Sequence, residues 1–199
     1  MSLLIESIKL LDGQFCNLFY HESRMNKALR TLCGESEHFE LEPFLEKFDQ
    51  PKQGLYKCRI TYDDNSKTIE FLPYTYQPIQ TLRVVEHDRI SYEFKYQDRR
   101  TINRLFELRR ECDDILIVKK GLVTDTSYCN IVFKNNRIWY TPWSPLLKGT
   151  QRQKLIERDQ IIEEEIRVSD ISSFKKFKLI NAMWEFDGPE LDVSNIILK

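Results

Sequence analysis

Glycine is scarce in this chain: only 6 of its 199 residues are glycine, and proline contributes 7. Walker loops and dinucleotide-binding loops use several closely spaced glycines to wrap a phosphate, and no such cluster occurs here. The same counts argue against collagen-like and low-complexity structures. Net charge is also nearly absent, since 30 Lys and Arg oppose 31 Asp and Glu. We therefore expect neither a nucleic-acid partner held by bulk electrostatics nor binding to an anionic membrane surface.

Long apolar runs are missing, and none approaches the roughly 20 residues that cross a bilayer. The opening residues 1–6 contain no basic segment followed by an apolar one, so no secretory signal is expected. The five cysteines are widely spaced without a C-x-x-C pair, and the three histidines lie far apart. We therefore expect free thiols, no metal site and a reducing, cytoplasmic location.

Apolar material is plentiful, because 41% of the residues are hydrophobic and 12% are aromatic. That is enough for a sizeable core. The patterns predict an α+β chain with a small N-terminal lobe, residues 1–78, and a C-terminal lobe, residues 79–199. The second half is richer in predicted strands, which favours a barrel-like or mixed sheet there.

Local patterns place the elements. Asp12-Gly13 is a hairpin signal between two strands, and the stripe of Met25, Leu29 and Leu32 indicates a helix. A strand at 89–96 is predicted because Ile90, Tyr92, Phe94 and Tyr96 alternate with polar residues, among them Lys95. In full, strands are predicted at 4–11, 15–20, 54–62, 68–74, 81–85, 89–96, 114–118, 128–133, 137–141, 166–168 and 176–186, and helices at 21–32, 42–48, 100–110 and 151–165, with a further short helix starting at Ser169-Asp170.

Four features occur in an order that suits a pyridoxal-phosphate site: Arg24, Lys95, Asp125 and the helix start Gly149-Thr150. The cofactor's aldehyde needs a lysine amine. Its pyridine nitrogen needs a carboxylate, so that the nitrogen stays protonated and the ring can draw electrons. Its phosphate needs a helix N-terminus and an arginine. A phosphate held in this way requires few glycines.

The chain resembles the class IV pyridoxal-phosphate aminotransferases, the branched-chain and D-amino-acid type, together with the aminodeoxychorismate lyases. The resemblance runs from about residue 5 to residue 183 and depends on the joint order of several segments. These are Ile5-Glu6-Ser7-Ile8-Lys9 with Asp12-Gly13, His21-Glu22-Ser23-Arg24, Gly121-Leu122-Val123-Thr124-Asp125 with Asn130, Ile131 and Phe133, Tyr140-Thr141-Pro142, Leu147-Lys148-Gly149-Thr150-Gln151-Arg152, and Ile180-Asn181-Ala182-Met183.

The resemblance implies a role for each matching position. Lys95 corresponds to the Schiff-base lysine and Asp125 to the acid that faces the pyridine nitrogen. Arg24 and the backbone N–H groups of Thr150 and Gln151 would bind the phosphate. Asn181 would lie nearby, and Ser7 falls where the lyases carry a hydroxyl that helps proton transfer.

Two positions depart from the family pattern, because Asp125 replaces a glutamate and Gln151 replaces a threonine. A second register is also open, in which Asn103-Arg104-Leu105 matches the family's Lys-x-x-Asn-Arg-Leu. That register would place Arg100 at the catalytic position and predict an inactive protein. The distance to Asp125 favours Lys95.

The function that the resemblance implies is 4-amino-4-deoxychorismate lyase, which releases pyruvate and leaves 4-aminobenzoate for folate synthesis. The alternatives are an amino-acid aminotransferase and a degenerate member that binds without turnover. The Ile180–Met183 segment and Ser7 favour the lyase. The expected partners are a small-molecule amino substrate and a second copy of the chain in a homodimer.

Overall fold

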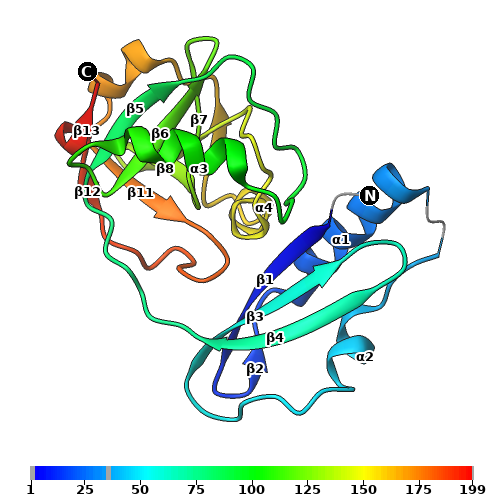
Figure 1. The fold of residues 1–199 in the computed structure, drawn as a ribbon. Helices are drawn as coiled ribbons and strands as arrows, with labels where there is room; N and C mark the ends of the chain where they lie inside the picture. The colour runs from blue at the N-terminus through cyan, green and yellow to red at the C-terminus, as the bar shows by residue number, and fades with distance from the viewer. Residues whose placement is uncertain (1–2, 35–36, 199) are drawn as a thin grey trace. The chain divides into compact units, whose positions relative to one another are not determined.

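In a computed structural model that describes residues 3–34 and 37–198, the chain divides into two compact units (Figure 1). The first comprises Met1–Tyr76 and Phe94–Asp98, and the second comprises Gln77–Glu93 and Arg99–Lys199. Residues 94–98 lie beyond the boundary expected at residue 78, yet they belong to the first unit. Each unit has its own sheet and its own hydrophobic core.

The first unit contains an antiparallel sheet in the order β2-β1-β3-β4. Its strands are Leu4–Leu11 (β1), Gln14–Phe15 (β2), Leu55–Tyr62 (β3) and Lys67–Pro73 (β4). In β1, every second side chain from Leu4 to Leu10 is fully buried, as the alternation of a strand requires. The predicted turn is present, with positive φ angles of 48° at Asp12 and 79° at Gly13, the conformation that joins tightly paired strands.

Helices Leu18–Cys33 (α1) and Leu41–Leu45 (α2) pack on this sheet. The buried stripe of α1 contains Met25, Ala28 and Leu29, whose spacing matches the helical period. These residues join both helices to β1 and β3 in one core of Leu4, Ile8, Met25, Ala28, Leu29, Leu41, Leu45, Cys58, Ile60 and Tyr62. The core holds α1, which carries Arg24, against β1, which carries Glu6 and Ser7.

The second unit contains a mixed sheet in the order β10-β9-β8-β7-β6-β5-β13, and β8 also pairs with β11. Three pairs are parallel, namely β5 with β6, β5 with β13 and β9 with β10. The strands are Leu82–Glu86 (β5), Asp114–Lys119 (β6), Leu122–Thr126 (β7), Asn130–Asn135 (β8), Ile138–Pro142 (β9), Ile162–Glu164 (β10), Lys176–Ile180 (β11), Leu191–Asp192 (β12) and Ile196–Ile197 (β13).

Strand β8 organises this unit. Ile131, Val132 and Phe133 are all fully buried, with Ile131 and Phe133 in one hydrophobic cluster and Val132 in another. The strand is therefore covered on both faces. Its first residue, Asn130, is paired with Asp125 of β7 on one side and with Ile180 of β11 on the other. The helices of the unit are Arg100–Phe106 (α3), Thr150–Glu157 (α4) and the short 3-10 turns Glu107–Arg109 (η1), Val168–Ser173 (η2) and Val193–Asn195 (η3).

The predicted strand at 89–96 is wrong, because only Tyr96 forms a bridge there, with Leu4. Residues up to Glu93 belong to the second unit, whereas Phe94 and Tyr96 pack against the core of the first. The alternation of apolar residues thus reflects burial in two units rather than one strand.

Other predicted boundaries also need correction. The strand at 15–20 ends at Phe15, since Asn17 adopts a left-handed conformation (φ 59°) and begins α1. The helix at 151–165 ends at Glu157, and Asp159 has a φ of 54°. The strand at 166–168 is reduced to one bridge before η2, and the strand at 176–186 ends at Ile180. Asn and Asp tolerate positive φ better than most residues do. The residue types at Asn17 and Asp159 are therefore consistent with boundaries at these two positions.

Within the described residues, no helix has the length and apolar character that crossing a membrane requires. The same residues contain no group of three or more His, Cys, Asp or Glu side chains arranged to hold a metal ion.

Burial separates the described cysteines by reactivity. Cys58 is fully buried in the first core, and burial raises the pKa of its thiol to about 12, whereas Cys16 and Cys112 are partly exposed. Because the thiolate is the reactive form, we expect iodoacetamide at pH 8 to modify Cys16 and Cys112 but not Cys58 in the folded protein. Peptide mass mapping before and after unfolding in urea measures the difference. Rapid modification of Cys58 without denaturant would contradict this assignment.

Candidate active site

The predicted site residues fall into two groups. Ser7, Arg24 and Lys95 belong to the first unit, and Asp125, Thr150, Gln151 and Asn181 belong to the second. Each unit also contains one buried carboxylate beside members of its group, Glu6 in the first and Asp125 in the second.

In the first unit, Glu6 of β1 receives the side chains of His21 and Arg24 from α1. Arg24 donates from Nε to Glu6 Oε1 at 2.8 Å and from Nη2 to Glu6 Oε2 at 2.6 Å. His21 Nδ1 donates to Glu6 Oε2 at 2.7 Å. His21 and Arg24 reach the same carboxylate because residues three apart share one side of a helix. We call these three residues the Glu6 cluster.

The Glu6 cluster is an ion pair between Glu6 and Arg24 to which the His21 imidazole is hydrogen-bonded. Burial opposes ionisation of Glu6, but the Arg24 charge and the His21 hydrogen bond outweigh it and lower the pKa of Glu6 to about 2. Burial also lowers the pKa of His21 below its usual value, although the Glu6 contact opposes that shift. Since Glu6 is completely buried and the Arg24 side chain is only 15% exposed, the bidentate pair fixes the orientation of the guanidinium.

Lys95 lies half-buried in the irregular segment that follows Phe94. Its carbonyl accepts the Ile5 N–H at 2.9 Å, so the edge of β1 holds the backbone at this point. The Lys95 charge is the smallest of the causes that lower the pKa of His21. The hydrogen bond from Ile5 places the Lys95 backbone beside β1, next to the residue that precedes Glu6.

Ser7 is the next residue of β1 after Glu6 and is half-buried. Successive side chains of a strand point to opposite faces, so Ser7 lies on the other face of the sheet from Glu6. The structure therefore does not bring Ser7 into the Glu6 cluster.

In the second unit, Asp125 occupies the end of β7 and is 6% exposed. Its Oδ1 accepts Asn130 Nδ2 at 2.7 Å, and its Oδ2 accepts the Leu147 N–H at 2.9 Å. Asn130 Nδ2 also donates to the Leu147 carbonyl at 2.9 Å. The carboxylate is therefore attached to the loop that leads into α4. We call Asp125, Asn130 and Leu147 the Asp125 cluster.

The electrostatics of Asp125 differ from those of Glu6. Burial raises the pKa of Asp125 to about 6, although the Leu147 and Asn130 hydrogen bonds and the Arg152 charge work in the opposite direction. The hydrogen-bond donors to this carboxylate within its cluster, the Asn130 amide and the Leu147 N–H, are both uncharged. An acid poised near neutral pH is suited to share a proton with a basic nitrogen.

Helix α4 begins at Gly149 against the Asp125 cluster. A Cβ added to Gly149 would lie 2.1 Å from Asn130 Oδ1, so only glycine lets the helix start come this close. Thr150 and Gln151 in the first turn are 4% and 2% exposed. The backbone N–H groups of a first turn point away from the helix body and favour an anion. The structure thus places a carboxylate and a helix N-terminus side by side.

Arg152 anchors this helix start, because its buried Nη2 donates to the Pro142 carbonyl at 2.9 Å and to Glu163 Oε1 at 2.5 Å. Asn181 lies at the end of β11, where its Oδ1 accepts the N–H groups of Met183 and Trp184, both at 2.9 Å. Its Nδ2 lies 3.1 Å from Cys129 Sγ. The structure therefore brings Asn181 beside the residue that precedes Asn130.

Sequence reasoning assigned no role to Glu6, His21 and Asn130 of these clusters or to Arg152 of α4, although each lies inside a matched segment. The only available signal was their place in those segments. Chain order alone does not show that Glu6 pairs with Arg24, or that Asn130 joins Asp125 to the loop before α4.

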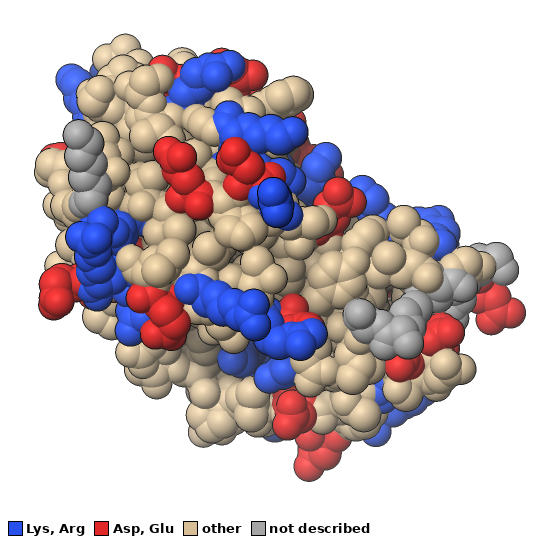
Figure 2. Space-filling model, turned by 45° about the horizontal axis from the view of Figure 1, so that its top comes forward, with Lys and Arg blue, Asp and Glu red and all other residues tan. Residues whose placement is uncertain are grey.

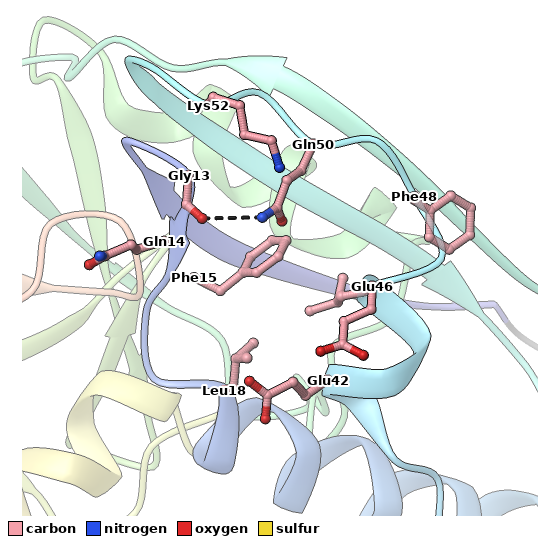
Figure 3. A pocket seen from close by; sticks show the side chains of 10 residues that line it. Gly13, Gln14, Phe15, Leu18, Glu42, Glu46, Phe48, Gln50 and Lys52 are labelled. Atoms are coloured by element: carbon pink, nitrogen blue, oxygen red, sulfur yellow. Dashed lines mark hydrogen bonds between the residues drawn. The ribbon is translucent and has the colours of Figure 1, made fainter.

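A separate cavity in the first unit, shown in Figure 3, has a volume of about 420 Å³. Its lining includes Phe15, the carboxylates of Glu42 and Glu46, and Gln50, which donates to the Gly13 carbonyl at 3.2 Å. None of the predicted site residues lines it. On the molecular face in Figure 2, basic and acidic side chains are interspersed, which agrees with the nearly balanced composition.

The Glu6 cluster predicts acid-sensitive stability. Because its folded pKa of about 2 lies below the ordinary 4.5, ionised Glu6 stabilises the fold above pH 4.5, and this contribution is lost as the pH falls toward 2. The shift corresponds to about 3 kcal/mol. We expect Glu6→Gln to lower the free energy of unfolding by roughly 3–5 kcal/mol at pH 7 and to flatten its decline below pH 4.5.

Urea unfolding followed by circular dichroism from pH 2 to pH 7 measures this effect. Exposed Glu70 on β4 of the same sheet supplies the matched control, and Glu70→Gln should retain the wild-type slope. An unchanged acid slope in Glu6→Gln would show that the cluster does not stabilise the fold.

Comparison with known proteins identifies the family. The family model described as amino-transferase class IV matches residues 3–186. An uncharacterized protein of Haemophilus influenzae is 38% identical over 182 residues, covering 90% of this chain and 97% of that protein. The crystal structure of a protein from Haemophilus somnus 129pt, named "putative 4-amino-4-deoxychorismate lyase", is 36% identical with a TM-score of 0.86, covering 92% of this chain and 97% of the other.

A more distant structure has the same fold. It is an aminotransferase from Brucella abortus bound to pyridoxal phosphate, 18% identical with a TM-score of 0.73, covering 96% of this chain and 83% of the other. The α+β architecture with two sheets matches the expected fold class. From the extent of the family match, the chain belongs to the class IV aminotransferases, a family of pyridoxal-phosphate-dependent enzymes.

Proposed function

We propose that this protein is a pyridoxal-phosphate-dependent enzyme. The observation that carries the proposal is the Asp125 cluster, in which a buried carboxylate is fixed beside the start of α4. Pyridoxal phosphate has a basic ring nitrogen at one place and a phosphate at another. A carboxylate and a helix N-terminus are the protein groups that suit them.

The residues present fit this cofactor. Asp125 has neutral hydrogen-bond donors on both oxygens and a pKa near 6, so it is suited to hold a protonated ring nitrogen. Gly149 permits the close approach of α4 that brings Thr150 and Gln151 near. Arg24 is oriented by Glu6 and remains partly exposed. The chain thus contains residue types suited to each end of the cofactor.

When bound, pyridoxal phosphate would supply an aldehyde that reacts with amines and a ring that withdraws electrons from the carbon bearing the amine. Lys95 Nζ would be the group that moves a proton at this carbon. Asp125 would hold positive charge at the ring nitrogen. Arg24 and the first-turn N–H groups of Thr150 and Gln151 would bind the phosphate.

Two further residues have supporting roles in the proposal. The family resemblance assigns Ser7 a hydroxyl for proton transfer, although its side chain lies on the face of β1 opposite the Glu6 cluster. Asn181 supports the phosphate end, since its contact with Cys129 links β11 to the start of β8. If borohydride attaches the cofactor to the wild-type protein but Ser7→Ala leaves the reaction rate unchanged, Ser7 has no part in proton transfer.

Within this family we propose 4-amino-4-deoxychorismate lyase activity. The substrate is a small amine from which pyruvate is eliminated, and the aromatic product is 4-aminobenzoate. Two observations support the lyase: the 36% identity to the Haemophilus somnus protein of that name, and the Ile180–Met183 segment. We also propose the homodimer that the family resemblance implies, which light scattering of the purified protein measures directly.

Lys95 is the residue to test first. Pyridoxal phosphate added to the purified protein should produce a yellow complex, and borohydride should then attach the cofactor irreversibly to Lys95. Mass mapping locates the label. Lys95→Ala should lose both colour and label, whereas Lys27→Ala, which removes an exposed lysine of α1, should keep them. A label that persists in Lys95→Ala would reject the assignment, and no colour in the wild type would indicate a member without this cofactor.

The substrate assignment has its own test. Wild-type protein loaded with pyridoxal phosphate and given 4-amino-4-deoxychorismate should release 4-aminobenzoate and pyruvate in equal amounts. Lys95→Ala should reduce the rate by at least about 100-fold, since it removes the acid–base group. Liquid chromatography measures both products. Amino transfer from ordinary amino acids without 4-aminobenzoate formation would replace the lyase by an aminotransferase.

A further inference from the structure

We propose that Asn130 is a positioning residue that joins the nitrogen-binding carboxylate and the phosphate-binding helix start into one receptor. The inference rests on the proposed function, since it assigns those two ends to pyridoxal phosphate. Asn130 itself touches neither end of the ligand in this scheme. It acts through the groups that do.

The first support is that the Asn130 side-chain amide donates hydrogen bonds to two different groups. One hydrogen of Nδ2 goes to Asp125 Oδ1 at 2.7 Å, and the other goes to the Leu147 carbonyl at 2.9 Å. The Leu147 N–H returns to Asp125 Oδ2 at 2.9 Å. These three bonds close a ring that contains the carboxylate, the amide and the loop. Rotation of Asp125 would therefore break a bond to the loop, and displacement of the loop would break a bond to Asp125.

The second support is steric and independent of the first. The Asn130 oxygen lies against the backbone of Gly149, where an added Cβ would approach it to 2.1 Å. The amide cannot turn aside at low cost, because Nδ2 is already held at two points. The Asn130 Nδ2 group thus fixes the orientation of the Asp125 carboxylate, and the Asn130 oxygen fixes the position at which α4 begins.

The third support is the strand that carries the residue. Asn130 is 7% exposed and is the first residue of β8, paired with Asp125 on one side and with Ile180 on the other. The following residues, Ile131 to Phe133, are fully buried. A side chain at the end of such a strand is held on a rigid support, which is what a positioning group requires.

Loss of Asn130 should therefore weaken two interactions of the ligand together. Asn130→Ala removes a hydrogen bond to a carboxylate and releases the loop before α4. Hydrogen bonds to charged groups contribute about 1.5–3 kcal/mol, which corresponds to a loss of affinity of roughly 10- to 100-fold. The loss should be large only for a ligand that uses both the ring nitrogen and the phosphate.

Three ligands separate these contributions: pyridoxal phosphate, pyridoxal without the phosphate, and a carbocyclic analogue with carbon at the ring-nitrogen position. Quenching of tryptophan fluorescence in the apoprotein measures each dissociation constant. Asn130→Ala should weaken the binding of pyridoxal phosphate by at least 10-fold. It should weaken the binding of each of the other two ligands distinctly less. Asn135→Ala, at the exposed far end of the same strand, should leave all three constants unchanged.

Equal losses for all three ligands in Asn130→Ala would overturn the coupling and indicate a general structural defect. Where Asn130→Ala does not fold, by circular dichroism, Asn130→Asp serves instead, because it keeps the shape but removes both donors. It should show the same ligand dependence. Failure of the wild type to bind pyridoxal phosphate would overturn the proposed function together with this inference, whereas wild-type binding with equal losses overturns only the role of Asn130.

A double-mutant cycle tests the steric contact. Gly149→Ala should weaken pyridoxal phosphate binding by at least 10-fold in the wild-type background, since the methyl group meets Asn130. In the Asn130→Ala background, the obstructing oxygen is gone, so the same methyl group should change the affinity by less than about twofold. Non-additivity of this kind is expected only for residues in contact. Additive losses would show that Asn130 does not position the helix start.

Discussion

The hydrogen bond from Asn130 to the buried Asp125 carboxylate is the interaction on which the arrangement of the second unit's site depends. It exists because β7 and β8 bring the two residues opposite each other. It has consequences at a distance because the same amide also holds the Leu147 carbonyl. A bond within one pair of strands thus determines where the following helix can begin.

The two units stabilise a buried carboxylate in opposite ways. Glu6 has a bidentate arginine and an imidazole, and its pKa falls to about 2. Asp125 has an amide and a backbone N–H, and its pKa rises to about 6. The first arrangement produces an ion pair that persists until the pH approaches 2, so that Arg24 stays oriented over a wide pH range. The second leaves a carboxylate that responds to the charge of whatever lies against it. The difference follows from the partner groups, because both carboxylates are almost completely buried.

The sequence was informative where a local rule decides the structure and less so where a distant contact does. The Asp12-Gly13 turn and the buried stripe of α1 were predicted because turn residues and the helical period act over a few positions. The strand predicted around Lys95 was wrong because its alternating residues are divided between two units. For the site, the residue types were visible in order along the chain. Their partners were not, since Glu6 with Arg24 and Asn130 with Leu147 are pairs separated by 18 and 17 positions.

The low glycine content acquires a specific meaning at Gly149. Its backbone angles, φ −67° and ψ 146°, lie in an extended region that any residue adopts without strain. Glycine is required there for space alone, because the Asn130 oxygen occupies the position of a side chain. A Walker-type loop uses glycines for their backbone freedom, repeatedly, to wrap a phosphate. In the proposed site the phosphate-binding element is a helix start, and one glycine suffices to bring it against a carboxylate. A chain with six glycines is therefore compatible with a phosphate site of this kind, provided that a strand supplies a side chain such as Asn130 to set the distance.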